Sequence, residues 1–385
     1  NIANKGKGGA VRISGTQTAL DISQATFTHN QASSGGAISI DSSASMHMSH
    51  TTAFNNNAVG GDGGFLFARL ALPVLVYDST IRQSKTSKNG GGGGLAVYST
   101  RIALANVAIE DCQAGKKGGG GVFIDQGTEG HLFGGVLENN KAEFDGGHIY
   151  SAASSLIVHS KESMVTWPDQ EPVFIQSNDL TSNTGTTMRS GTASYSGGSV
   201  SCVASKSDQV LTLYENEKDS SACQSNVYKF SYSALNNSSA SAYYACPSKG
   251  VYLGTGTTIS ESTAGKNGGA ISANLCSVEM SSAIISKGTA LTGEGGAVMV
   301  SVESSLRVDD TSSFEENQAL KGSGGAVSCR DCDTMSFRTR TMFRSNVAYK
   351  SGGAVHVTSP TLPITSTGTI YVENTAQEFD GGAVC

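Results

Sequence analysis

Apolar and polar residues alternate along this chain in short runs that are separated by Gly, Ser, Asn and Asp. The stretch after Gly324, for example, contains AVSC, then TMSFRTR, then TMFRSN. Alternation with a period of two, bounded by turn residues, is typical of β-strands, and no segment shows the 3.6-residue period of a helix. The pattern therefore predicts about three short strands in each unit of the sequence.

The strand pattern belongs to a repeat made of two short words. One copy is FRSNVA at Phe343–Ala348 followed by GGAVHV at Gly352–Val357. Other copies are FTHNQA with GGAISI, FNNNA with GGFLF, LENNKA with GGHIY, FEENQA with GGAVSC, and YVENTA with GGAVC. A fixed internal period is the signature of repeat architectures, so the repeat determines the fold prediction.

The period is close to 27 residues. The second Gly of each Gly-Gly pair serves as a marker, at Gly9, Gly36, Gly64, Gly94, Gly121, Gly147, Gly269, Gly296, Gly325, Gly353 and Gly382. The intervals are 27, 28, 30, 27 and 26 residues in the first half and 27, 29, 28 and 29 in the second. A leucine ladder with a following helix is absent, and WD40 and tetratricopeptide repeats are longer, which excludes those arrays.

Three strands in a 27-residue turn describe an all-β, right-handed parallel β-helix. We expect one β-helical domain over residues 1–385, with about 12 turns stacked roughly 4.8 Å apart, or about 60 Å of rod. The residues expected to face inward are Ala10, Ile38, Phe65 or Leu66, Val122, Ile149, Ile271, Val298, Val327 and Val355, with Phe27, Phe54, Leu137, Ile285, Phe314, Phe343 and Tyr371 from the first word.

The Gly and Asn of the repeat have structural explanations. A Gly pair at a strand start permits a positive-φ turn and a close approach of stacked backbones, and the expected turn glycines are Gly36, Gly64, Gly147, Gly269, Gly296, Gly325, Gly353 and Gly382. Side-chain amides in one register can form a hydrogen-bonded ladder from turn to turn, and the expected ladder is Asn30, Asn57, Asn140, Asn317, Asn346 and Asn374. A ligand-binding role for this Asn row is the weaker alternative.

Two segments interrupt the period, at about 160–195 and 203–255. The first contains Trp167, the only Trp, and the second contains half of all the Tyr residues. Insertions in solenoids emerge as loops on one face, often the face that recognises a partner. We therefore expect recognition to reside in these insertions and in outward-facing strand residues.

The eight cysteines favour a disulfide-permissive, extracellular setting. Their spacing fits no zinc template, and the disulfide candidates are Cys329, Cys332, Cys202, Cys223, Cys246 and Cys276. We interpret Cys329 and Cys332 as a local structural disulfide rather than a redox pair; the pairing of the others stays open, and Cys112 and Cys385 are candidates for crosslinks to other segments. Two overlapping sequons make Asn236 and Asn237 glycosylation candidates.

Composition and charge exclude several classes of partner. The formal net charge is −6, with 26 Lys and Arg scattered along 385 residues, which gives no support for nucleic-acid binding. No apolar run of about 18 residues is present, so no membrane span is expected in this chain. No cofactor or metal site is predicted, because the seven His residues lack ligand spacing.

An enzymatic role was tested because many parallel β-helices cleave acidic polysaccharides. Hydrolysis requires clustered carboxylates, and lyase chemistry requires several acids around Ca²⁺ with an Arg base. The chain offers Asp309-Asp310, and we expect Asp309 to lie one turn below Arg338 as an exposed ion pair. Asp62, Asp145, Glu294 and Asp380 precede Gly pairs, but turn preference explains them. We expect no enzyme.

The alternation of GGA-[Ile, Val, Leu] with Phe-x-x-Asn resembles the repeat of chlamydial polymorphic outer-membrane proteins, within the pectin-lyase-like β-helix superfamily. The resemblance covers nearly all of the chain outside the two interruptions. It implies secretion, display at a cell surface, and adhesive or structural roles, such as a building block of a filament or an adhesin. The alternative is a secreted protein that binds or cleaves polysaccharide.

The ends of the chain both lie within or beside a GG word, and neither carries a recognisable cap. We therefore expect a piece of a longer β-helical rod, or a rod that stacks end to end or laterally. The expected partners are other copies or further segments of the same chain, with a cell-surface protein or glycan as a further candidate.

Overall fold

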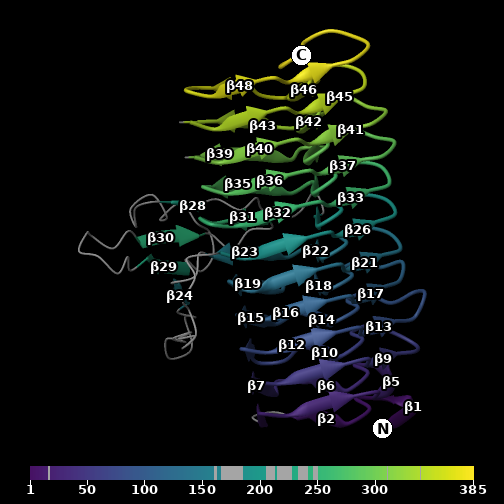
Figure 1. Ribbon diagram of the computed structural model, residues 1–385. Coiled ribbons are helices and arrows are strands. Elements are labelled where there is room, and N and C mark those ends of the chain that lie inside the picture. Colours follow the sequence, from purple (N-terminus) through teal and green to yellow (C-terminus); the bar gives the residue numbers. More distant parts are fainter. Residues whose placement is uncertain are drawn as a thin grey trace.

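The computed structural model describes residues 1–15, 18–159, 185–204, 250–309, 311–338 and 340–385, together with short strands at 163–165, 213–214, 228–232 and 242–245. This part of the chain is all-β and contains no helix. Its strands wind into a right-handed parallel β-solenoid of about 11 turns, which confirms the predicted fold class (Figure 1).

Each turn contributes strands to four parallel sheets, so the prediction of three strands per turn was wrong. The strand that the sequence pattern missed belongs to sheet A and is only two residues long in most turns, as in Gln318–Ala319. Two residues are too few to show an alternation of apolar and polar positions, and these pairs lie inside the FxxNxA word.

Sheet A forms one narrow edge of the rod and carries an inward-facing Ala in most turns. Its hydrogen-bonded order is β1 (Ile2–Lys7), β5 (Gln31–Ser34), β9 (Asn57–Ala58), β13 (Lys85–Thr86), β17 (Gln113–Ala114), β21 (Lys141–Ala142), β26 (Thr192–Ala193), β33 (Thr263–Ala264), β37 (Thr289–Ala290), β41 (Gln318–Ala319), β45 (Val347–Ala348) and β49 (Thr375–Ala376).

Sheet B is formed by the aliphatic residues that follow each Gly pair. Its order is β2 (Val11–Ser14), β6 (Ile38–Asp41), β10 (Leu66–Arg69), β14 (Leu95–Tyr98), β18 (Val122–Asp125), β22 (Ile149–Ala152), β27 (Val200–Val203), β34 (Ile271–Asn274), β38 (Val298–Ser301), β42 (Val327–Arg330) and β46 (Val355–Thr358).

Sheet C follows sheet B in each turn and contains the five-residue strands of the coil. Its order is β3 (Ala19–Ser23), β7 (Ser45–Ser49), β11 (Val74–Tyr77), β15 (Arg101–Ala105), β19 (Glu129–Phe133), β23 (Ser155–His159), β31 (Gly250–Leu253), β35 (Ser277–Ser281), β39 (Ser305–Asp309), β43 (Thr334–Phe337) and β47 (Thr365–Ser366).

Sheet D holds the aromatic or aliphatic residue that begins the first word of the repeat. Its order is β4 (Thr26–Thr28), β8 (Thr52–Phe54), β12 (Thr80–Arg82), β16 (Ala108–Glu110), β20 (Val136–Glu138), β25 (Thr187–Arg189), β32 (Thr258–Ser260), β36 (Ile284–Ser286), β40 (Ser313–Glu315), β44 (Met342–Arg344) and β48 (Ile370–Val372).

The two insertions both leave the coil beside sheet C. The first follows β23, and the coil resumes at Thr187, earlier than the predicted boundary near 195; the second lies between β27 and β31. Because β23 pairs directly with β31, the coil stays continuous across both insertions. Strands β24 (Ser163–Val165), β29 (Tyr228–Tyr232), β30 (Ala242–Ala245) and β28 (Leu213–Tyr214) form a small antiparallel sheet.

This small sheet joins the insertions to each other, because β24 belongs to the first insertion and pairs with β29 of the second. Figure 1 shows β24, β29 and β30 to one side of the coil, at the height of its middle turns. We call these four strands the insertion sheet. The sequence predicted loops at both interruptions, and the pairing between them has no signature in the repeat.

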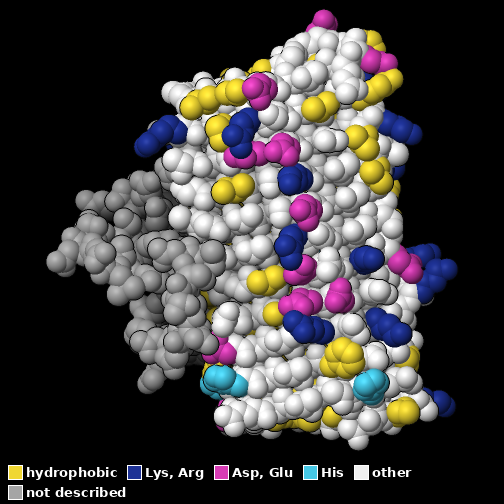
Figure 2. Space-filling view, viewed as in Figure 1, with side chains coloured by type: hydrophobic (Ala, Val, Ile, Leu, Met, Phe, Trp, Pro, Cys, Tyr) yellow, Lys and Arg dark blue, Asp and Glu magenta, His cyan; other side chains and the backbone are white. Residues whose placement is uncertain are grey.

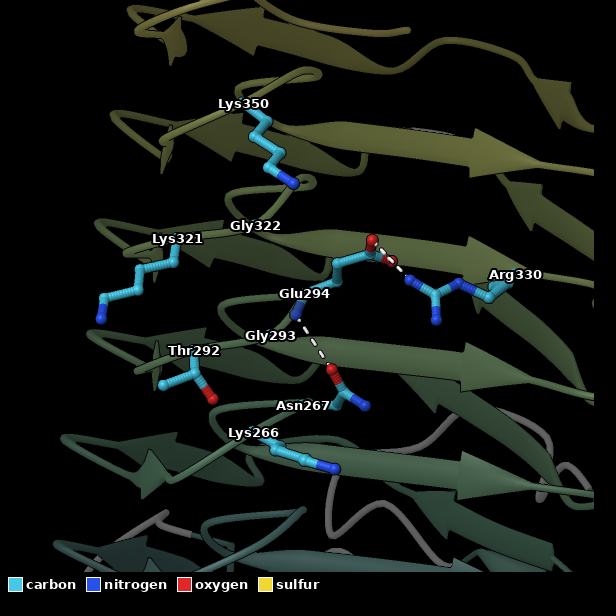
Figure 3. A pocket seen from close by; sticks show the side chains of 9 residues that line it. All are labelled: Lys266, Asn267, Thr292, Gly293, Glu294, Lys321, Gly322, Arg330 and Lys350. Carbon is cyan, nitrogen blue, oxygen red and sulfur yellow. Dashed lines mark hydrogen bonds and ion pairs between the residues drawn. The ribbon is translucent and has the colours of Figure 1, made fainter.

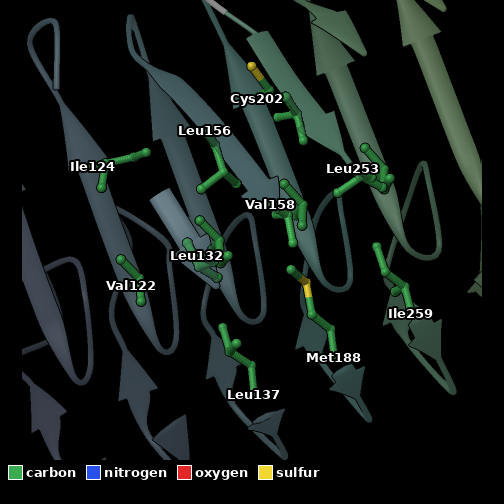
Figure 4. Close-up of a cluster of buried hydrophobic side chains, with 14 of the residues drawn as sticks. Val122, Ile124, Leu132, Leu137, Leu156, Val158, Met188, Cys202, Leu253 and Ile259 are labelled. Carbon is green, nitrogen blue, oxygen red and sulfur yellow. The ribbon is translucent and has the colours of Figure 1, made fainter. Parts of the chain in front are cut away.

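The core is one apolar cluster that runs along the inside of the coil from Ala37 to Val355. Figure 4 shows how side chains from successive turns stack there, with Leu132 and Leu156 beside Val158. Most of the predicted inward residues belong to it, but Phe54 was wrong. Its neighbour Ala53 faces inward instead.

The reason is a one-residue shift in that turn. Thr28 pairs with Phe54, so Phe27 stacks on Ala53 and the FNNNA word is out of register with FTHNQA. The marker glycines Gly94 and Gly121 are displaced in the same way. Backbone contacts instead align Gly93 and Gly120 with Gly64, because the long glycine runs conceal the register.

The two glycines of each pair have separate functions. Gly352 has a φ of 64°, the left-handed conformation, whereas a Cβ on Gly353 would lie 2.1 Å from the carbonyl oxygen of Gly382 in the next turn. The same approach, at 2.0–2.1 Å, occurs at Gly36, Gly64, Gly147, Gly269, Gly296 and Gly325. At Gly382 no stacked backbone lies so close, and the nearest atom is 3.5 Å away.

Candidate functional site

One column of the coil, directly before sheet A, contains the asparagines of the repeat. In its upper part the Nδ2 of Asn317 donates to the Oδ1 of Asn346 at 3.0 Å, and the Nδ2 of Asn346 donates to the Oδ1 of Asn374 at 2.9 Å. The same Asn346 amide also donates to the carbonyl of Phe314. These side chains satisfy backbone groups at a buried corner, and Asn317 and Asn346 are fully buried. No face of the ladder is left for a ligand.

In the lower part of the column the prediction of Asn57 was wrong. The ladder residue is Asn56, whose Oδ1 accepts from the Nδ2 of Asn30 at 2.9 Å, while Asn57 faces outward in sheet A. The register shift at Phe54 causes this error. Asn140 occupies the column as well, but it bonds the Nδ1 of His148 at 2.9 Å rather than another Asn.

His148 stands where most turns have an Ala after the Gly pair. It is fully buried, and burial lowers the pKa of its imidazole to about 3, so the ring is neutral. It fills space above Gly191, which occupies the Asn column in the next turn. This group is a local substitution within the core and not a site.

Among the residues that the structure describes, four cysteines form two disulfides. Cys202 pairs with Cys276, and Cys329 pairs with Cys332. Cys385 is exposed. Cys112 is buried in the Asn column, and burial raises the pKa of its thiol to about 12, so the expectation that it crosslinks to other segments was wrong. The predicted candidates Cys223, Cys246, Asn236 and Asn237 lie outside the described residues.

Carboxylates and arginines meet on the outer face of sheet C. Asp309 accepts from the Nε of Arg307 at 2.7 Å and lies 3.9 Å from the Nε of Arg338, one turn above, as the sequence predicted. Glu279 lies one turn below Arg307. The pKa of Glu279 is raised to about 7, chiefly by burial; the charge of Arg307 opposes the shift and that of Asp309 adds to it.

A second polar cluster on sheet C was not predicted. The Nδ1 of His131 lies 2.8 Å from the Nε2 of His159, and its Nε2 lies 2.6 Å from Glu129. Both rings are buried on the outward side of the sheet, and His159 stacks on Phe133 at 4.2 Å. Within the described part of the chain, no group of three or more His, Cys, Asp or Glu side chains could hold a metal ion.

In the middle turns, the outward face of sheet C is apolar, although it points away from the core inside the coil. Ala103, Ala105 and Phe133 are buried there, and Leu75 and Tyr77 pack against them. These turns lie next to the point where both insertions leave the coil. In these turns, outward-facing strand positions that are polar in other turns hold apolar residues. That difference is the sequence signal that could have predicted this buried face.

A row of lysines follows the opposite edge, at the loops from sheet A to sheet B. Each Lys comes two residues after the inward residue of a sheet A strand, in the exposed series Lys88, Lys116, Lys266, Lys321 and Lys350. The composition suggested scattered charge, but the constant offset from the repeat brings these side chains to one edge. Turns are stacked about 4.8 Å apart, so lysines from adjacent turns are neighbours.

Two aromatic residues interrupt the lysine row at the same offset. Phe144 and Tyr195 stack with ring centroids 4.8 Å apart, and both are exposed. The Nζ of Lys266 lies 4.2 Å above the centroid of the Tyr195 ring. The edge is therefore amphipathic, with cations and aromatic faces presented together.

A shallow cavity of about 300 Å³ lies in the upper part of this edge (Figure 3). Lys266, Lys350 and Arg330 border it, and Glu294 is the only acid among its lining residues. Arg330 bonds Glu294 at 2.6 Å, and the backbone N–H of Glu294 donates to Asn267. Lys321 points away from the cavity in Figure 3, so the lysines do not converge on one small ligand.

The charges on sheet D contrast with this edge because they are paired from turn to turn. Arg82 bonds Glu110, Arg189 bonds Glu138, and Arg344 bonds Glu315. Figure 2, in which the strands of sheet B face the viewer as in Figure 1, shows basic and acidic side chains alternating along the rod on that face too. Dark blue and yellow side chains gather instead along the edge at which Figure 1 places β33 to β45.

Comparison with known proteins identifies the fold. Residues 1–162 match a family model described as a right-handed beta helix region. Searches of curated proteins and of solved structures found no match. In the described part of the chain, no helix is long and apolar enough to cross a membrane.

Proposed function

We propose that this chain is an extracellular structural or adhesive rod, which acts through its surface and not through an active site. The observation that supports the proposal most strongly is the single apolar core, which continues from turn to turn on both sides of the insertions. Such a core makes a solenoid stiff, because every turn is fixed by its two neighbours.

The residues of the repeat have structural roles in the coil itself. Phe314 and Phe343 stack inside it, Asn346 satisfies its corner, and Gly352 and Gly353 form its turn. Recognition therefore falls to the surface features that are not part of the repeat. These are the insertions beside sheet C and the lysine row.

The extracellular setting rests on the two disulfides. Cys202–Cys276 and Cys329–Cys332 are compatible with an oxidising compartment, where such bonds persist. Adhesion and surface display come from the resemblance of the repeat to chlamydial surface proteins.

The alternative function, binding or cleavage of a polysaccharide, is favoured by one observation. Glu279 and Asp309 lie on adjacent turns of sheet C with Arg307 between them, and a carboxyl with a pKa of about 7 is suited to proton transfer. Against catalysis, Asp309 is already engaged by Arg307 at 2.7 Å.

Electron microscopy combined with an adhesion assay tests the main proposal. The chain immobilised on beads is compared with a variant in which residues 160–184 and 205–249 are replaced by short Gly-Ser linkers, on immobilised extracellular-matrix proteins and on a glycan array. We expect straight rods that associate, and adhesion that the variant loses. Solitary rods that adhere no better than uncoated beads would contradict the proposal.

An assay of product release separates the two functions. Incubation with acidic polysaccharides should yield neither new reducing ends nor unsaturated products. Release of products by the chain, lost in Glu279→Gln and retained in the matched surface variant Glu261→Gln, would establish the enzymatic alternative instead.

A further inference from the structure

The outward face of sheet A is partly apolar over three consecutive turns. Leu291, Leu320 and Tyr349 follow strands β37, β41 and β45 directly and are 40%, 45% and 38% exposed. Their backbone N–H groups bond the carbonyls of Ala264, Ala290 and Ala319 respectively, so they continue the sheet. Large apolar side chains in an exposed row are typical of a surface that packs against a partner.

Charged side chains border this face on both sides. On the sheet D side, the corner residues of three successive turns are Glu261, Lys287 and Glu316; on the sheet B side, the loops of the same turns carry Lys266, Thr292 and Lys321. Glu261, Glu316, Lys266 and Lys321 are exposed, and no ion pair involves any of them in the described part of the chain. Glu261 accepts only a hydrogen bond from the Ser190 hydroxyl, at 3.3 Å.

The arrangement is self-complementary. When two parallel rods are related by a two-fold axis along their length, Glu261 and Glu316 of one lie opposite Lys266 and Lys321 of the other at the same height, and Lys287 meets the uncharged Thr292. Antiparallel rods that overlap over these three turns would place Glu261 against Glu316, Lys266 against Lys321 and Lys287 against its own copy. We propose that the outward face of sheet A between β33 and β45 pairs laterally with the same face of a second copy, in parallel orientation.

The charges define both the orientation and the extent of this pairing. In the lower half of the coil, Lys85 and Lys141 face outward from sheet A and would meet their own copies across the axis, which opposes contact there. In the upper half the corresponding residues are the uncharged Thr263, Thr289 and Gln318. The acid–lysine turns and the apolar row coincide with this neutral segment.

The contact between two copies is small. A strip four turns long and about 15 Å wide buries on the order of 300 Å² on each rod, below the ~800 Å² of a standard interface. Pairing of isolated rods is therefore weak and sensitive to salt, since exposed charges are screened over about 8 Å at physiological ionic strength.

This inference specifies the lateral partner of the proposed structural rod, and a charge-swap experiment tests it. The basic-row variant is Lys266→Glu with Lys321→Glu, and the acidic-row variant is Glu261→Lys with Glu316→Lys. Sedimentation velocity at low salt over a range of concentrations gives the self-association constant of each. We expect each variant alone to self-associate at least about tenfold more weakly than the wild type.

Mixing the two variants should restore association, because each row of one then meets the opposite charge on the other. The matched control is Arg12→Glu with Arg340→Glu, which makes the same change in net charge at exposed residues on other faces. It should associate like the wild type, and when mixed with the acidic-row variant it should give no such restoration. Circular dichroism verifies that all variants fold.

A crosslinking experiment in the Cys385→Ser background establishes the orientation. Thr263→Cys should crosslink to Thr263→Cys of a second copy, and a Thr263→Cys to Thr375→Cys crosslink in a mixture would indicate antiparallel rods and overturn the proposal. Monomeric wild-type chain would also overturn it, as would lysine-dependent binding of heparin or polyglutamate without self-association. These failures leave the proposed structural role intact if microscopy still shows assemblies formed through another face.

Discussion

Asn56 and Asn57 are adjacent in sequence and identical in chemistry, but only one of them belongs to the ladder. The Asn56 Oδ1 accepts from the backbone N–H of Asn30 at 3.1 Å and from its Nδ2 at 2.9 Å, and the Asn56 Nδ2 donates to the carbonyl of Phe27 at 3.0 Å. Asn56 is fully buried, whereas Asn57 faces outward from sheet A. Replacing each by Ala isolates the contribution of the ladder.

Asn56→Ala removes three hydrogen bonds and leaves the buried N–H of Asn30 without an acceptor. An unsatisfied buried group costs about 1–3 kcal/mol, and the lost bonds bring the expected loss of stability to about 3 kcal/mol. Asn57→Ala should change stability by less than about 0.5 kcal/mol, as for other surface substitutions.

Native-state hydrogen exchange is the appropriate measurement, because a stack of turns opens locally and a global melting curve would average over it. A loss of about 3 kcal/mol predicts a fall of about 100-fold in the protection of amides near Asn30, since 1.4 kcal/mol corresponds to a factor of ten. Equal effects of Asn56→Ala and Asn57→Ala, or a larger effect of Asn57→Ala, would refute the register and the ladder with it.

Three further predictions concern the corner, a buried carboxyl and a disulfide. Gly353→Ala should destabilise the upper turns by several kcal/mol, since its Cβ would overlap the carbonyl of Gly382, whereas Gly60→Ala, whose nearest contact would be the Ser33 hydroxyl at 3.2 Å, should cost far less; urea denaturation of both variants compares them. Glu279 has a pKa raised to about 7 from 4.5, so the folded state holds its proton more tightly than the unfolded state. Its contribution to stability should therefore fall as pH rises from about 4.5 through 7, by about 3 kcal/mol, and Glu279→Gln should abolish this dependence of the urea midpoint on pH. Replacing both Cys202 and Cys276 by Ala opens a bridge with a sequence separation of 74 residues, and the loop-entropy model predicts a loss of about 4 kcal/mol; an unchanged urea midpoint would contradict that estimate.

The local sequence determined the parallel β-helix, its period and most of its core. This is because the same constraint recurs in every turn: an apolar residue faces in, an amide satisfies the corner, and Gly353 leaves room for the backbone of the next turn. Repetition turns a weak local pattern into a strong one, so that single errors such as Phe54 did not affect the fold prediction.

The tertiary structure decided what depends on register and on neighbours distant in sequence. A shift of one residue selected Asn56 over Asn57, and a strand of two residues added the fourth sheet. Stacking brought Lys266 and Lys321 to one edge and paired β24 with β29 across two insertions. Sequence determines which residues suit the inside of a turn, because that constraint is local. Only the stacking of turns determines which outward residues become neighbours. Those neighbours form the surface on which the proposed function depends.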